Sequence, residues 1–239
     1  MADSKSALII GATGQTGRHL LQNLLASSHF TRVGEYGRKV TPASEITLGK
    51  DKLEQKIIDF EKIHESGLNK EKWDVVFITL GTTKALAGSA EAFEKIDRDA
   101  AKEARFAGSS QRLIYCSAGE ANPKSALLYP RSKGLTEVGL AGLGYTDFIV
   151  FRPAFLAGTQ RGDHRLAESI VGKITSVLSH VSSAVEIQVS DLAQAMYQAG
   201  KLGSDAIPPS INATQGGEGD DKFTLIKNAG ALKFAELKD

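Results

Sequence analysis

The sequence predicts an α/β fold: a doubly wound parallel sheet with helices on both faces. Short apolar runs alternate with amphipathic stretches along most of the chain, which is the pattern of repeated strand–helix units. One of these runs, residues 75–80, contains no charged residue, as expected of a strand covered on both faces. The chain also has 24 glycines and only 6 prolines, a balance that suits many tight strand-to-helix turns.

The first half of the chain supplies most of the expected strands. Residues 17–26 repeat leucine at helical spacing and therefore predict the first helix. The strand at 32–36 is the weakest of these predictions, because Gly34 and Glu35 lie inside it and neither favours a strand. In chain order, the elements expected here are strand 7–10, helix 17–26, strands 32–36, 56–59 and 74–80, and helix 89–107.

The second half continues the alternation. Pro130 suits the first turn of a helix, where its missing N–H is not needed. Ser190 or Asp191 is expected to cap the last helix, and the Gly- and acid-rich residues 215–221 predict a loop. In chain order, the elements expected here are strand 112–117, helix 130–141, strand 147–151, helix 163–180, strand 185–189 and helix 192–199.

Composition limits the kind of protein this can be. Apolar residues make up 41% of the chain, which is enough for a sizeable core. A length of 239 residues is ordinary for one α/β domain, so we expect residues 1–239 to form one domain, with a small substrate-side extension after about residue 153. The 29 basic and 28 acidic residues give a net charge of +1, which argues against a nucleic-acid binder. The single cysteine, Cys116, excludes an internal disulfide, and the five histidines show no metal-ligand spacing, so no metal is expected. The longest apolar runs are too short to span a membrane.

A glycine-rich turn is the strongest signal of function. The apolar run 7–10 leads directly into Gly11-x-x-Gly14-x-x-Gly17, and a leucine-rich helix follows. One glycine permits the tight turn, one lets the backbone approach a pyrophosphate, and one lets the helix pack close to the strand, while the helix N-terminus offers free amides to phosphate. The alternative is a merely tight strand-to-helix turn. We predict a Rossmann-type dinucleotide site to which the turn contributes Gly11, Thr13, Gly14, Gln15, Thr16 and Gly17.

The residues after the second expected strand bear on the choice of cofactor. An NAD site places an acid at the end of this strand to hold the ribose hydroxyls, but here Gly37 takes that place and Arg38 and Lys39 follow. Arginine can fork onto a 2′-phosphate with lysine as a neighbouring point charge, so the sequence favours NADP(H). Two alternatives stay open: the cations belong to the solvated surface, or Glu35 imitates the NAD acid. Asp59 is expected to accept a hydrogen bond from the adenine amino group, the alternative being a turn or capping residue.

A tyrosine, a lysine and a serine suggest the chemistry. Tyr129 and Lys133 have the i, i+4 spacing that stacks two side chains on one helix face, and a cation near a phenol lowers its pKa. Tyr129 could then give a proton to a carbonyl oxygen, while Ser117, at the end of its strand, orients that oxygen. The alternative is a helix-start tyrosine beside a solvated lysine. The motif is weak alone, since Tyr197 and Lys201 repeat it, and we interpret that copy as a core tyrosine and a C-terminal lysine.

Together these motifs resemble the atypical branch of the short-chain dehydrogenase/reductase superfamily over roughly residues 7–200. Within it, the chain is most similar to the Tat-interacting oxidoreductase-like group, including its fungal mitochondrial members. The segments that carry the resemblance are Gly11-Ala-Thr-Gly-Gln-Thr-Gly-Arg18, Gly37-Arg-Lys39, Asp59-Phe-Glu-Lys62, Leu80-Gly-Thr-Thr-Lys84, Asp97-Arg-Asp99, Tyr129-x-x-x-Lys133 and Phe151-Arg-Pro153.

The resemblance implies further site residues and NADPH as the ligand. Residues implied to line the cofactor, besides the glycine-rich turn, are Arg38, Lys39, Asp59, Phe60, Leu80, Gly81, Thr82, Tyr129, Lys133, Pro153 and Ala154. Two departures from the family pattern bear on turnover more than on binding. Gly-Thr-Thr replaces the common Asn-Ala-Gly after the fourth strand, and Asp97 stands where many members carry asparagine.

The resulting prediction is an NADPH-dependent oxidoreductase that reduces a small carbonyl substrate by hydride transfer. The alternative is an NADPH-binding regulatory or assembly protein with little turnover, which would have a protein partner. With no presequence recognisable, the cytosol is the default location, while the resemblance leaves the mitochondrial outer surface and peripheral membrane association open.

Overall fold

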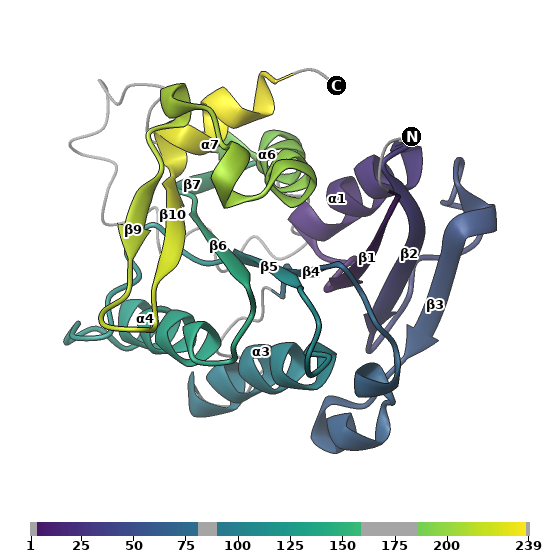
Figure 1. Cartoon of the computed structure of the whole chain (residues 1–239), viewed down its shortest axis with the longest axis horizontal. Helices are drawn as coiled ribbons and strands as arrows, with labels where there is room; N and C mark the ends of the chain where they lie inside the picture. Colours follow the sequence, from purple (N-terminus) through teal and green to yellow (C-terminus); the bar gives the residue numbers. More distant parts are fainter. Residues whose placement is uncertain (1–3, 81–89, 159–185, 238–239) are drawn as a thin grey trace.

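The predicted parallel sheet is present, with strands in the order β3-β2-β1-β4-β5-β6-β10-β9 (Figure 1). The computed structural model describes residues 4–80, 90–158 and 186–237. The strands are β1 (Lys5–Ile10), β2 (Phe30–Gly37), β3 (Leu53–Ile57), β4 (Val75–Ile78), β5 (Arg112–Cys116), β6 (Asp147–Arg152), β7 (Phe155–Ala157), β8 (Glu186–Gln188), β9 (Thr214–Gly216) and β10 (Phe223–Lys227). The α-helices are α1 (Gln15–Ala26), α3 (Ala90–Ala104), α4 (Leu128–Ala141), α6 (Val189–Leu202) and α7 (Asn228–Ala235). Short 3₁₀ turns are η1 (Lys50–Lys52), η2 (Phe60–Glu65), η3 (Leu68–Lys70), η5 (Ser204–Ala206) and η6 (Pro209–Ile211).

The order of the strands fixes where a ligand site can form. The chain moves from β1 through β2 to β3 in one direction and then returns to place β4 on the other side of β1. Neighbouring strands from β3 to β10 are parallel, and β9 alone pairs antiparallel, with β10. In such doubly wound sheets, ligands bind beyond the carboxyl ends of the strands at the point where the direction reverses. That point here lies between β1 and β4.

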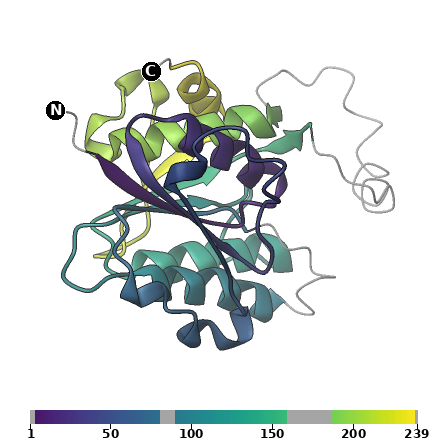
Figure 2. The same ribbon diagram turned by 90° about the vertical axis from the view of Figure 1, so that its right-hand side faces the viewer.

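Two layers of helices cover the sheet. Helices α1, α6 and α7 lie on one side, and α3 and α4 lie on the other (Figure 1). The view turned by 90° shows the same separation (Figure 2). The leucines that predict α1 are all buried in the first layer: Leu20, Leu21, Leu24 and Leu25. The sheet is therefore covered on both faces, which is why its central strands are continuous apolar runs.

Strand β2 is regular despite its glycine and glutamate. A Cβ added to Gly34 would lie 2.6 Å from the ring of Trp73, so the glycine is what lets this fully buried indole pack across β2. The Trp73 ring also meets Tyr36 edge-on and carries the Arg32 guanidinium 4.1 Å from its centroid. The residue that weakens β2 as a sequence prediction is thus required by the packing of a neighbouring segment.

Several predicted boundaries differ from the structure. β3 begins and ends earlier than the predicted strand 56–59. The prediction misplaced it because this edge strand has mostly exposed residues and no apolar run to mark it. Helix α6 begins at Val189 with Gln188 as its N-cap, so the predicted cap at Ser190 or Asp191 is wrong, although Asp191 still lies in the first turn. The predicted helix at 163–180 lies outside the described residues.

The C-terminal part of the sheet is the main element that the sequence pattern does not predict. Strand β9 occupies the start of the expected loop 215–221, and the rest of that loop turns into β10. β10 adds to the sheet next to β6, and α7 then packs against α6. Part of the segment after β6 therefore belongs to the central sheet, as strands β10 and β9.

We expect Gly34→Ala to lower the free energy of unfolding by about 1–3 kcal/mol, since the added methyl group must displace the buried Trp73 ring. The matched control is Gly139→Ala on α4, where the new Cβ meets only the flexible Arg98 side chain. That variant should instead gain about 0.5–1 kcal/mol from helix propensity. Urea unfolding of both variants measures the difference, and equal stability of the two would contradict the packing argument.

Candidate functional site

The glycine-rich turn closes tightly around the end of β1. Gly11 has a φ of +101°, and a Cβ on it would lie 2.8 Å from the carbonyl carbon of Thr79. A Cβ on Gly17 would lie 2.1 Å from the Gly11 carbonyl oxygen, whereas one on Gly14 would come no closer than 3.2 Å to any neighbour. Gly11 and Gly17 therefore permit a close approach of backbone that no other residue allows. This turn joins β1 and α1 next to the end of β4.

The N-terminus of α1 is suited to an anion. Gly14 is its N-cap residue and supplies no side chain to bond the first-turn amides. Thr13 is exposed, Gln15 is half-buried and Thr16 is buried, so the turn presents both backbone and side chains at its edge. Free amides at a helix start, together with the helix dipole, favour a phosphate group. The turn and helix start thus fit the pyrophosphate of a dinucleotide.

Other predicted cofactor residues lie at the same edge of the sheet. Leu80 follows β4, and its backbone nitrogen would be 2.9 Å from a Cβ on Gly11, which places it against the glycine-rich turn. Pro153 and Ala154 follow β6 and pack over Gly119 beyond β5. The Ala154 N–H donates to the Asn228 side chain at 3.0 Å, which ties this segment to the start of α7. Gly81 and Thr82 lie outside the described residues.

The end of β2 carries two exposed cations. Arg38 and Lys39 follow Gly37, which lies beside the end of β1, and both are exposed. Among the described residues neither has an ion-pair partner. Glu35, the residue that could imitate an NAD acid, is 1% exposed. Its Oε1 accepts hydrogen bonds from the backbone and hydroxyl of Thr41 at 2.8 and 2.7 Å, so this carboxylate is already engaged.

The residues after β3 are placed differently from the two cations. Asp59 is the N-cap of η2, and its Oδ1 accepts a hydrogen bond from the Glu61 N–H at 2.9 Å. The capping alternative therefore describes its present contact, although an ionised carboxylate retains further acceptor positions. Phe60 is half-buried and packs against the core on the α3 and α4 side.

Lys133 belongs to a buried triad with Tyr115 and Asp97. The Lys133 ammonium donates to the Tyr115 phenol oxygen at 2.9 Å, and that phenol donates to Asp97 Oδ2 at 2.8 Å. Lys133 Nζ also lies 3.6 Å from Asp97 Oδ2, and both side chains are at most 4% exposed. Tyr129, one turn earlier on α4, is by contrast 57% exposed. The predicted pair thus divides, with the lysine inside the protein and the tyrosine at the surface.

Burial and charge set the protonation of this triad. Burial raises the pKa of Asp97, and the Lys133 charge and the Tyr115 hydrogen bond oppose that rise. Asp97 Oδ1 has no hydrogen-bond partner among the described residues, which adds to the cost of its charge. Burial, with the nearby Asp97 charge, holds the pKa of Tyr115 well above its usual range. Tyr115 therefore stays a neutral phenol, which accepts from Lys133 and donates to Asp97.

Ser117 is held by a second buried network. Its hydroxyl donates to Glu137 Oε1 at 2.5 Å, and Glu137 is 1% exposed. Arg152 donates to both oxygens of the same carboxylate, at 3.0 Å from Nε and 2.5 Å from Nη2. A serine hydroxyl has one hydrogen, so Ser117 in this arrangement can accept from a ligand but cannot also donate to it.

Four residues of these networks carry no assigned role in the sequence-based prediction: Asp97, Tyr115, Glu137 and Arg152. Tyr129, Lys133 and Glu137 follow one another at i, i+4 spacing on α4. Tyr115 on β5 precedes Ser117, the residue just beyond that strand, by two positions, which is the spacing of side chains on one face. Those spacings were the signal available in the sequence. The bonding partners, however, come from different elements and required the fold.

Tyr197, from the second Tyr-x-x-x-Lys copy, is part of the core, as predicted. Tyr197 is 3% exposed, and its hydroxyl lies 2.8 Å from that of Ser27. Cys116 packs against the hydrophobic core on the sheet face opposite Tyr115, and burial raises the pKa of its thiol to about 11. Tyr197 therefore has a structural role, through its contact with Ser27 at the end of α1.

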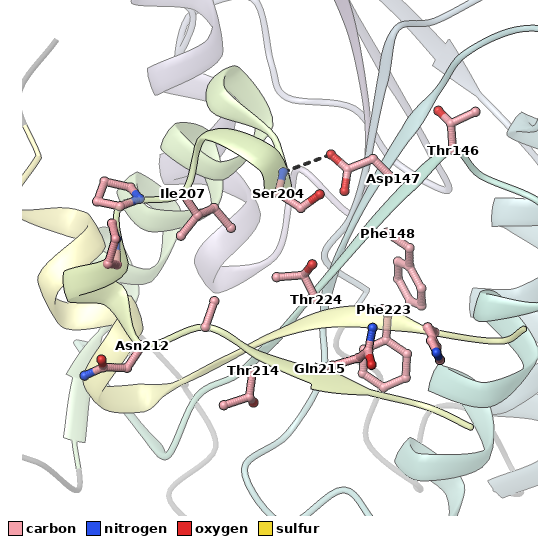
Figure 3. A pocket seen from close by; sticks show the side chains of 14 residues that line it. Thr146, Asp147, Phe148, Ser204, Ile207, Asn212, Thr214, Gln215, Phe223 and Thr224 are labelled. Carbon is pink, nitrogen blue, oxygen red and sulfur yellow. Dashed lines mark hydrogen bonds between the residues drawn. The ribbon is translucent and has the colours of Figure 1, made fainter. Parts of the chain in front are cut away.

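A shallow cavity of about 640 Å³ lies at the opposite edge of the sheet, between the starts of β6 and β10 (Figure 3). Its carboxylate, Asp147, is already neutralised by Arg112 at 2.6 Å and accepts from the Ser204 N–H at 3.1 Å. Because ligands of doubly wound sheets bind at the carboxyl edge, this cavity is not the candidate site.

Comparison with known proteins identifies relatives in fungi. The mitochondrial protein fmp52 of Emericella nidulans is 34% identical over 184 residues, covering 74% of this chain and 78% of that protein. The fmp52 protein of Aspergillus fumigatus is 30% identical over 241 residues, covering 96% and 98%. This chain belongs to the Fmp52 family. Rat HTATIP2 is also similar, at 34% identity over 156 residues, covering 64% of this chain and 63% of that protein. No protein-family model matches the chain.

Solved structures show the same Rossmann-like fold at low identity. The Bordetella bronchiseptica enzyme WbmH, crystallised in complex with NAD⁺, has a TM-score of 0.56 and 19% identity, covering 82% of this chain and 72% of that chain. A nucleoside-diphosphate-sugar epimerase from Agrobacterium tumefaciens has a TM-score of 0.57 and 15% identity, covering 92% and 75%. At these identities the likeness concerns the fold.

The described residues contain no group of three histidine, cysteine, aspartate or glutamate side chains placed to hold a metal ion. None of the helices described is both long enough and apolar enough to cross a membrane.

We expect Lys133→Met to lower the free energy of unfolding by about 3–5 kcal/mol near neutral pH, since it leaves the Asp97 carboxylate buried without its cation. Folding already raises the pKa of Asp97, and the variant removes the charge that opposes the rise. An acid whose pKa is raised by folding binds its proton more tightly in the folded state. The loss of unfolding free energy in Lys133→Met is therefore largest above the pKa of Asp97 in the folded variant, and it shrinks as the pH falls through that pKa.

Urea unfolding of this variant at neutral and at acidic pH tests the argument. The double variant Asp97→Asn/Lys133→Met is the control, because it removes both charges and should recover part of the lost stability. The same loss at both pH values, or no recovery in the double variant, would show that the charges are not coupled.

Proposed function

We propose that this chain is an NADP(H)-dependent oxidoreductase that reduces the carbonyl group of a small substrate. The arrangement of the carboxyl edge of the sheet carries this proposal. The glycine-rich turn lies at the switch point between β1 and β4, and the exposed cations Arg38 and Lys39 follow the neighbouring strand β2. A site that can hold a pyrophosphate and, beside it, one further phosphate fits NADP(H) better than NAD(H).

Glu35 supports this preference for NADP(H). An NAD site needs an acid that is free to accept hydrogen bonds from the ribose hydroxyls. Both Glu35 oxygens already accept hydrogen bonds, Oε1 from Thr41 and Oε2 from Gln55 at 2.7 Å. The only nearby acid that could imitate an NAD determinant is thus occupied within the described structure.

We assign the catalytic roles by matching the chemistry of each side chain to its position. NADPH, when bound, supplies a hydride to the carbonyl carbon. Tyr129 is placed at the surface of the first turn of α4, where its phenol can meet a substrate and protonate the carbonyl oxygen. We assign to Lys133, one turn later on α4, the role of favouring loss of that proton by its charge; its ammonium lies inside the protein, where Tyr115 and Asp97 hold it. Ser117 can donate a hydrogen bond to the carbonyl oxygen only after its hydrogen bond to Glu137 breaks.

That last requirement favours a second candidate function. A protein that binds NADPH but turns it over slowly could retain the Ser117–Glu137 bond and use the cofactor to change its affinity for a protein partner. The short bond and the Arg152 ion pair that fixes Glu137 support this alternative. The fungal relatives are named mitochondrial, so we propose the mitochondrion as the location in preference to the cytosol.

We expect Tyr129→Phe to slow NADPH-linked reduction of aldehydes and ketones by about 100-fold or more, the usual contribution of a positioned proton donor. NADPH affinity should fall far less than the rate, because phenylalanine keeps the aromatic ring that is expected to line the cofactor. The control is Tyr197→Phe, which removes the phenol of the other Tyr-x-x-x-Lys copy and should leave the rate intact. Tight NADPH binding without any Tyr129-dependent turnover would favour the regulatory protein instead.

We expect Arg38→Ala to weaken NADPH binding by about 10- to 100-fold, the loss of one or two charge-assisted hydrogen bonds, and to leave NADH binding unchanged. Lys72→Ala is the control, since it removes an exposed cation that precedes β4, at the opposite edge of the sheet. Fluorescence titration with each nucleotide measures the effect. Equal affinity of the wild type for NADPH and NADH would refute the proposed preference for NADP(H).

A further inference from the structure

Glu35 has a second consequence, because it joins three segments at the end of β2. Its Oε1 accepts from Thr41 at two points, the backbone N–H at 2.8 Å and the hydroxyl at 2.7 Å. Its Oε2 accepts from Gln55 Nε2 on β3 at 2.7 Å, and the same Gln55 nitrogen donates to the Thr41 carbonyl at 2.8 Å. Glu35, Thr41 and Gln55 therefore form a closed network of hydrogen bonds.

This network fastens the loop that carries the two cations. The loop leaves β2 at Gly37 and returns to the strand at Thr41, so that Arg38 and Lys39 lie between its two fixed ends. At the first end, the Gly37 carbonyl accepts from the Ile58 N–H at 2.9 Å. At the second end, the carboxylate of Glu35 holds both the backbone and the side chain of Thr41. A short loop fixed at both ends has little freedom to move its cations away.

The charge of Glu35 makes the arrangement informative. A buried carboxylate near Arg38 and Lys39 would, by its charge alone, weaken the attraction of this loop for a phosphate. Its hydrogen bonds act in the opposite sense, since they reduce the entropy that the loop loses on binding. The two effects predict opposite signs when the charge is removed and the shape of the side chain is kept.

We propose that Glu35 is a positioning residue that determines cofactor specificity, by holding the 38–41 loop so that Arg38 and Lys39 face the 2′-phosphate of NADP(H). This inference rests on the proposed function. Glu35 touches the loop and does not itself contact the cofactor. Glu35 lies two residues before the end of β2, a position that suggests an NAD acid. In this proposal the same residue supports an NADP(H) site instead.

The test compares two nucleotide fragments that differ only in the phosphate of interest. Adenosine 2′,5′-bisphosphate carries the 2′-phosphate, and adenosine 5′-monophosphate lacks it. Calorimetric titration of the full chain with each fragment gives the ratio of the two affinities. A general loss of structure would weaken the binding of both fragments, whereas a misplaced loop would weaken the binding of the bisphosphate alone. No turnover is required, so the measurement does not depend on the catalytic roles.

Glu35→Gln and Thr41→Val are the informative variants. Glu35→Gln keeps the shape but turns an acceptor toward Gln55 into a donor, so the network cannot close. We expect it to lower the affinity for the bisphosphate by about tenfold and Thr41→Val by about threefold, with the monophosphate unchanged. Thr41→Ser keeps the hydroxyl and should retain the wild-type ratio. Glu54→Gln, on the exposed side of β3, removes an equal charge outside the network and should also retain it.

The outcomes separate this inference from the proposed function. A wild type that binds both fragments equally overturns the NADP(H) preference and this inference with it. A wild type that prefers the bisphosphate, loses that preference in Arg38→Ala and keeps it in Glu35→Gln and Thr41→Val overturns only the role of Glu35. Tighter bisphosphate binding by Glu35→Gln would show that charge outweighs positioning, and it too would overturn the inference.

Discussion

The rest of the structure depends on the close contact between the glycine-rich turn and the two strands beside it. Gly17 brings the first turn of α1 against the Gly11 carbonyl, and Gly11 brings that turn against the end of β4. Any Cβ at either place would separate helix from strand by more than a packed core tolerates. This contact sets the position of the α1 N-terminus, and thereby the place where a phosphate can be bound. The order of the strands puts the same point at the reversal of the sheet.

Helix α4 is attached to the sheet by charge as well as by apolar packing. Lys133 reaches Tyr115 on β5 and Asp97 on α3, while Glu137 reaches Ser117 beyond β5 and Arg152 at the end of β6. Buried ion pairs of this kind add little net stability but are costly to break, so they specify one arrangement of the helix over the sheet. They also place Lys133 and Ser117 within buried hydrogen-bonded networks. The chemistry of the site is thus tied to the packing of α4.

Much of the fold was predictable because its signals are local. The leucine spacing of α1, the apolar run of β4 and the glycine spacing of the turn each act within one strand–helix unit, and each was confirmed by the structure. β10 and α7 were not predictable, since β10 is a short strand whose place beside β6 depends on a partner far away in the sequence. The edge strand β3 was misplaced because its exposed residues carry no hydrophobic pattern.

The sequence by itself determined which residue types are present at the candidate site: a glycine-rich turn, two cations after the second strand, and a tyrosine, a lysine and a serine in suitable order. Only the tertiary structure decided what each side chain bonds to. In the structure, Glu35 accepts hydrogen bonds from Thr41 and Gln55. Lys133 pairs with the buried Asp97, and Ser117 donates its hydrogen bond to Glu137. The physical reason is that hydrogen bonds and buried charges are satisfied by whichever groups the fold brings within about 3 Å, and those groups come from segments that are distant in sequence.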